Sequence, residues 1–172
     1  SRIENVLFAG ATTIHSEDEY AGTVAGQANK AWFQNIGVKS GGKIDAYDTA
    51  YAGGLVGKAE DVTIRSSYNA REVDGGGIVG SGSARTVIRD VYNQGTVQYG
   101  IIAKKETATT VERVYSTKAQ KNALWAGWSY AFESSSTTPT SSNDMGKFYF
   151  SDQTSVAGGG GKYHMALAES EQ

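Results

Sequence analysis

A period of 23 residues constrains the fold of this chain more than any other feature of its sequence. The segment Gly-Gly-Leu-Val-Gly at 53–57 recurs as Gly-Gly-Ile-Val-Gly at 76–80, as Tyr-Gly-Ile-Ile-Ala at 99–103 and, more loosely, as Asn-Ala-Leu-Trp-Ala at 122–126. Four apolar residues are therefore spaced 23 apart: Leu55, Ile78, Ile101 and Leu124. A fixed period of this length is typical of repeat architectures, in which each unit stacks on the next.

A second motif keeps nearly the same period. It ends in Tyr68, Tyr92 and Tyr115, at spacings of 24 and 23. Earlier copies of this motif lie at 3–6 and 33–36, and an earlier copy of the glycine motif, at 22–26, precedes the one at 53–57 by 31 residues. The first two repeats are therefore longer than the others by seven or eight residues, and we expect the insertions to form loops.

Each repeat contains short alternating segments rich in β-branched residues, separated by Gly, Asn and Asp, and none has a helical period. We therefore predict an all-β fold, a parallel and right-handed β-helix or solenoid with coils of about 23 residues. An antiparallel meander or a propeller blade is the alternative. We expect solenoid coils over 1–128, a Ser/Thr-rich loop over 129–146, and a terminal coil or cap over 147–172.

Composition excludes several classes of function. The formal net charge is -2, so the chain has no basic field to attract nucleic acid. There is no cysteine, which removes disulfides, thiolate metal sites and a cysteine nucleophile. The apolar runs are too short to span a membrane. The chain begins at Ser1 without an initiator Met or a signal peptide, which suggests a processed chain or a fragment.

The glycine motif, followed by a Tyr-Asn element as in 67–70 and 91–97, resembles the GLUG repeat of bacterial exported proteins. The tail also fits, because aromatic residues at 148–150 precede a glycine cluster that ends at Gly161 and a downstream Met165. The resemblance covers roughly residues 20–128 and 147–166. It implies a secreted or surface protein similar to filamentous-haemagglutinin-like adhesins or to the repeat part of streptococcal IgA proteases, and it carries no catalytic residues over.

Acidic residues gather in the insertions of the first two repeats, at 11–19 and 39–50. If the repeats stack, Glu17, Asp18 and Glu19 lie near Asp45 and Asp48. Carboxylates are the ligands that calcium prefers, so a calcium site is one hypothesis. A solvated acidic rim is the interpretation that we favour, since the chain has no known calcium-binding motif.

Three further groups recur or cluster. A stripe formed by Arg65, Arg89 and Arg113 could bind an anionic glycan, although a solvated, salt-linked face is the simpler interpretation. An aromatic run that includes Trp125, Trp128 and Tyr130 could plug the last coil or stack against a sugar. Asparagines at equivalent positions predict ladders inside turns: Asn5 with Asn35, and Asn69 with Asn93.

Three classes of function remain open. The first is a non-catalytic adhesive or structural segment of an exported bacterial surface protein, which would bind a host or cell-surface glycan or protein outside the cell. The second is a β-helix that binds or degrades polysaccharide, although the residues suggest no catalytic group beyond Asp45, Asp48 and Arg65. The third is a module that associates end to end into fibres through open strand edges.

Overall fold

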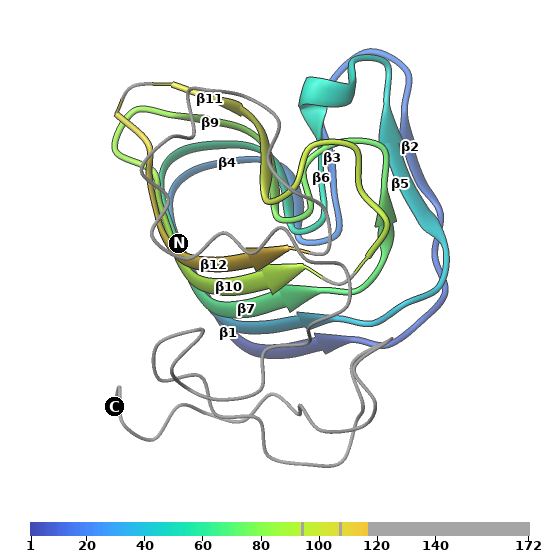
Figure 1. Cartoon of the computed structure of the whole chain (residues 1–172), viewed down its shortest axis with the longest axis horizontal. Helices are drawn as coiled ribbons and strands as arrows, with labels where there is room; N and C mark the ends of the chain where they lie inside the picture. The colour runs from blue at the N-terminus through green and yellow to red at the C-terminus, as the bar shows by residue number, and fades with distance from the viewer. Residues whose placement is uncertain (94, 107, 117–172) are drawn as a thin grey trace.

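The computed structural model describes residues 1–116, apart from 94 and 107 (Figure 1). Its strands are β1 (Arg2–Phe8), β2 (Ile14–Ser16), β3 (Ala21–Gly22), β4 (Ala25–Val38), β5 (Lys43–Ala46), β6 (Ala52–Gly53), β7 (Val56–Asn69), β8 (Glu72–Val73), β9 (Val79–Ser83), β10 (Val87–Asn93), β11 (Ile102–Lys105) and β12 (Thr110–Ser116). The 3-10 helix η1 (Thr49–Tyr51) is a single turn. The predicted regions 129–146 and 147–172 lie outside the described residues.

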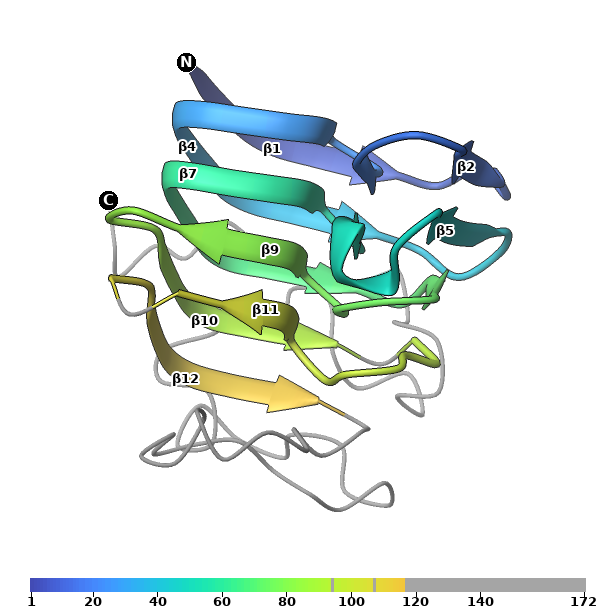
Figure 2. The same cartoon turned by 90° about the horizontal axis from the view of Figure 1, so that it is seen from above.

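Every pair of strands in the described part of the chain is parallel. The largest sheet has the order β1-β4-β7-β10-β12, and β9 joins it by pairing with β7 and β11. Figure 2 shows successive copies of the repeat lying one against the next, from β1 to β12. The prediction of an all-β chain with parallel pairing is confirmed, and the antiparallel meander is wrong.

The long strands β4 and β7 bend, and each contributes to two faces. The first half of β7 pairs with β9 and its second half pairs with β10, so that β9 and β10 together occupy the length of one long strand. The bends fall at non-glycine residues with positive φ, among them Lys30 and Asp61. Polar residues suit this left-handed backbone better than β-branched ones do.

Two smaller sheets complete the stack, with the orders β2-β5-β8 and β3-β6. The insertions of the first two repeats, which the sequence predicts to be loops, contain β2 and β5, and Ile14 pairs with Ile44. This prediction is wrong because an alternating segment of only three or four residues is too short to be distinguished from a loop by its pattern. The same sheet continues into repeats that have no insertion, because β5 also pairs with β8 and Val73 forms a parallel bridge with Val97.

The core lies between these sheets and is formed by equivalent residues of successive repeats. Leu55, Ile78 and Ile101 are fully buried, and backbone hydrogen bonds join them in order, from the Leu55 amide to the Ile78 carbonyl and from the Ile78 amide to the Ile101 carbonyl. Leu124, the fourth member of the predicted row, lies outside the described residues. Stacking lets each repeat bury its apolar face against the next repeat, which a single repeat of this size cannot do alone.

Candidate functional site

Two asparagine ladders run along the stack, as the sequence predicts. The Asn35 side chain donates to Oδ1 of Asn5 at 2.8 Å, and the Asn69 side chain donates to Oδ1 of Asn93 at 2.8 Å. Asn69 also donates to the carbonyl of Arg71, and its Oδ1 accepts from the Arg71 amide. Since Asn69 and Asn93 are fully buried, these bonds satisfy polar groups that water cannot reach.

Two tyrosines of the second motif, Tyr68 and Tyr92, are buried and stack on each other. The rings of Tyr68 and Tyr92 are parallel to within 13°, with centroids 5.2 Å apart. The backbone register continues the row to Tyr115. Burial raises the pKa of the Tyr68 hydroxyl from 10.0 to about 12, because the charged phenolate is poorly solvated there.

The raised pKa of Tyr68 predicts a loss of stability in alkali. The neutral hydroxyl is favoured in the fold, so the stabilisation is complete below pH 10 and disappears as the pH rises from 10 to about 12. Urea denaturation across this range should show the fall, and Tyr68→Phe should reduce it. The matched variant Tyr47→Phe, at a side chain that is 83% exposed, should leave the fall unchanged. Identical curves for the two variants would contradict this role of Tyr68.

The acidic residues of the first two repeats lie on the outside of the stack. Oδ1 of Asp45 lies 2.9 Å from Nδ1 of His15 across paired strands and accepts a hydrogen bond when that nitrogen carries a proton. Asp48 accepts from the Ala50 amide and caps η1. Glu17, Asp18 and Glu19 are exposed.

Among residues 1–116 that the structure describes, no group of three or more His, Asp or Glu side chains is arranged to hold a metal ion. His15 lies at the surface, with 54% of its side chain exposed. The calcium site stays a hypothesis, and the solvated acidic rim stays the interpretation that the sequence favours. The contacts of Asp45 and Asp48 are those of a polar surface whose carboxylates bond to neighbouring groups.

The arginine stripe differs from its prediction. Arg65 pairs with Arg89 in register, but the next residue in the row is Glu112, and Arg113 falls one position further on. The three arginines are spaced 24 residues apart in the sequence. The register advances by 24 residues from Arg65 to Arg89 but by only 23 from Arg89 to Glu112, so the equal spacing misleads. The Arg65 guanidinium carbon lies 5.6 Å from the centre of the Trp32 ring.

The aromatic run with Trp125, Trp128 and Tyr130 lies outside the described residues, so neither a plug nor a sugar platform is assessed there. In the part of the chain that is described, no helix is long and apolar enough to cross a membrane.

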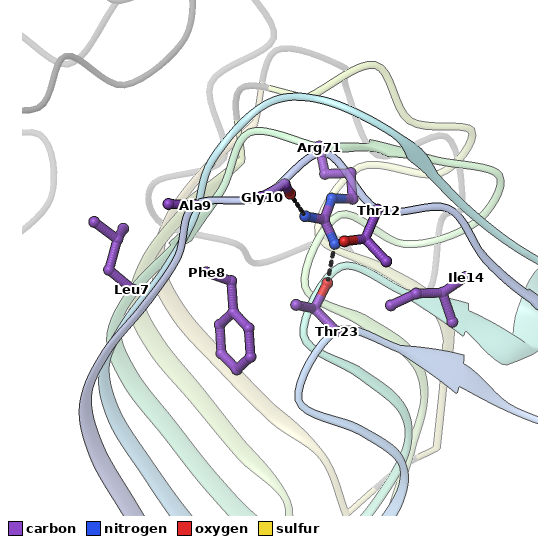
Figure 3. A pocket seen from close by; sticks show the side chains of 8 residues that line it. All are labelled: Leu7, Phe8, Ala9, Gly10, Thr12, Ile14, Thr23 and Arg71. Carbon is purple, nitrogen blue, oxygen red and sulfur yellow. Dashed lines mark hydrogen bonds between the residues drawn. The ribbon is translucent and has the colours of Figure 1, made fainter.

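Sequence reasoning missed a pocket of about 340 Å³ beside β1 and β2 (Figure 3). Its lining combines apolar and polar groups: Leu7, Phe8, Ala9, Gly10, Thr12, Ile14, Thr23 and Arg71. Figure 3 shows the Arg71 guanidinium between Gly10 and Thr23, with Phe8 and Ile14 on opposite sides of Thr23. Seven of these residues belong to the first repeat and to the start of the second, whereas Arg71 reaches them from the third.

Arg71 connects three repeats through its guanidinium. Its Nη2 group donates to the Gly10 carbonyl at 2.6 Å, its Nε group to the Gly41 carbonyl at 2.9 Å, and its Nη1 group to the Thr23 hydroxyl at 3.3 Å. The side chain is 2% exposed, and burial lowers the pKa of Arg71 from its ordinary value. Arg71 breaks the repeat, since Gly95 holds the equivalent position two residues after Asn93. An arginine where the next repeat has glycine is the signal in the sequence that could have identified Arg71.

No known protein family, curated protein or solved structure matches this chain.

Proposed function

We propose that the chain is a segment of right-handed parallel β-solenoid, with GLUG-like repeats, from an exported bacterial surface protein. In this proposal it serves as a non-catalytic adhesive or structural module outside the cell. The observation that carries the proposal is the register of the repeat: Tyr68 pairs with Tyr92, Asn69 with Asn93, and Ile64 with Ile88. A right hand is the expected one, since nearly all parallel crossovers take it.

The stacking of equivalent residues supports a structural role over an enzymatic one. Repetition places the same chemistry at each level of the stack, whereas catalysis requires different groups that converge on one point. The described rows consist of stacked tyrosines, bonded asparagines and packed aliphatic residues. These rows hold successive repeats together and leave the long outer faces for contact with a partner.

A host-surface or cell-surface glycan or protein is the partner that this role implies. Beads coated with the purified chain should be retained on a layer of cultured epithelial cells more strongly than uncoated beads. Pretreating the cells with glycosidases or with a protease then distinguishes a glycan from a protein partner.

The matched control is a chain that carries Gly54→Ala, a substitution expected to disrupt the stack, as argued in the Discussion. Beads coated with this variant should be retained no better than uncoated beads. Equal retention of uncoated beads and of beads carrying the unaltered chain would contradict an adhesive function.

A further inference from the structure

The charge of Arg71 has no counter-charge in the described part of the chain. The guanidinium bonds to two carbonyls and one hydroxyl, and no carboxylate among the described residues lies within salt-bridge distance of it. Buried charges in proteins are ordinarily paired, since removing an ion from water without a partner is costly. The site thus provides a desolvated positive charge that an anion would neutralise.

The guanidinium also retains hydrogen-bonding capacity. A guanidinium has five N–H donors in a fixed planar arrangement, and described groups accept from only three of them. The Thr23 hydroxyl accepts from Arg71, so its own hydrogen can be donated to a ligand. Thr12 adds a second hydroxyl to the lining. Several donors therefore converge at one wall of the pocket.

The rest of the pocket determines what kind of anion fits. Leu7, Ala9 and Thr12 on its rim are exposed, so the pocket opens to solvent, whereas Arg71 is buried. Phe8 and Ile14 supply apolar surface beside the donors. A volume of about 340 Å³ lies at the lower end of the range for small-molecule sites. This combination suits a carbon skeleton that bears one carboxylate better than it suits a small inorganic anion.

We propose that the pocket of Arg71, Thr12 and Thr23 binds a small organic carboxylate the size of an acidic monosaccharide. The guanidinium and the carboxylate match in their planar geometry, and charge-assisted bonds of this kind are stronger than neutral ones. The apolar walls contact the carbon skeleton. This inference concerns ligand chemistry and does not depend on the proposed adhesive function.

Glucuronate is a suitable probe, with glucose as its neutral counterpart. In the full chain labelled with ¹⁵N, glucuronate should shift the side-chain Nε resonance of Arg71 and saturate, whereas glucose at the same concentration should not. Glucuronate should also raise the melting temperature, because it binds the folded state. If the Arg71 resonance moves no more than those of surface arginines, the proposal is wrong. Equal affinity for sulfate would overturn the choice of an organic carboxylate.

Two variants separate binding from folding. Arg71→Met should abolish the effect of glucuronate, but it also removes three hydrogen bonds between repeats and could unfold the chain. Thr12→Trp fills the pocket from its exposed rim and keeps Arg71 in place, so it should weaken glucuronate binding at least tenfold while the fold persists. Unchanged affinity in folded Thr12→Trp would overturn the assignment of the pocket. The adhesion of coated beads is a separate measurement, so either proposal can fail alone.

Discussion

Gly54→Ala is expected to destabilise the chain by about 3 kcal/mol or more, whereas Gly10→Ala should change its stability very little. A Cβ at Gly54 would lie 1.9 Å from the carbonyl oxygen of Gly77 in the next repeat, and 2.7 Å from the Asn69 side chain. Backbone cannot yield as the end of a flexible side chain can, so the repeats would have to separate. At Gly10 the nearest atom is the Thr12 hydroxyl oxygen, at an ordinary 3.8 Å.

Urea denaturation of the two variants beside the unaltered chain measures this difference. The two substitutions add the same methyl group, and neither glycine has the positive φ that alanine avoids, so the comparison isolates the close approach of neighbouring repeats. Equal stabilities for the two variants would show that the close approach of neighbouring repeats does not require glycine at position 54.

Asn69→Asp is expected to cost about 4 kcal/mol at neutral pH, although the two side chains have the same shape. The Asn69 amide donates to the Arg71 carbonyl and to Oδ1 of Asn93, and a carboxylate can donate to neither. It would instead place a negative charge against two acceptors at a fully buried position.

This cost should depend on pH. Burial and the facing acceptors raise the pKa of the introduced carboxyl in the folded state above its unfolded value of about 3.9. The protonated form is therefore favoured in the fold, so the variant is most stable below about pH 3.9 and weakens as the pH rises through the raised pKa. Denaturation in urea at pH 4 and pH 7 should show a gap from the unaltered chain that widens at pH 7.

Asn5→Asp is the matched control. Asn5 is exposed and only accepts from Asn35, which a carboxylate can also do. Its φ of 59° is one that aspartate tolerates. This variant should lie within about 0.5 kcal/mol of the unaltered chain. If Asn5→Asp and Asn69→Asp cost the same, the buried ladder is not the cause of the effect.

The features that repeat could be predicted from the sequence. Leu55, Ile78 and Ile101 share a spacing, and parallel stacking turns equal spacing into direct contact. The same reasoning places Tyr68 beside Tyr92 and bonds Asn69 to Asn93. Parallel pairing follows from the repeat because equivalent residues meet only when successive copies run in one direction.

The features that do not repeat escaped prediction. Arg71 is not repeated, since Gly95 takes its position in the next repeat. Its hydrogen-bond partners Gly10 and Gly41 are 61 and 30 residues away, so no local sequence pattern connects them to it. The expectation for Arg113 is wrong because its repeat is one residue shorter, so that Glu112 occupies the register position beside Arg89. The sheet β2-β5-β8 is formed by strands of two to four residues, whose sequences resemble those of loops.

The central claim is that successive repeats stack in register, and a spin-label distance tests it most directly. Gln27, Lys58, Ser81 and Lys104 form one row of paired residues. Gln27 and Lys104 are exposed, and the chain has no native cysteine, so Gln27→Cys with Lys104→Cys allows specific labelling. Three strand spacings predict a backbone separation of about 14 Å and a narrow distribution of distances. A much longer distance or a broad distribution would contradict the stack.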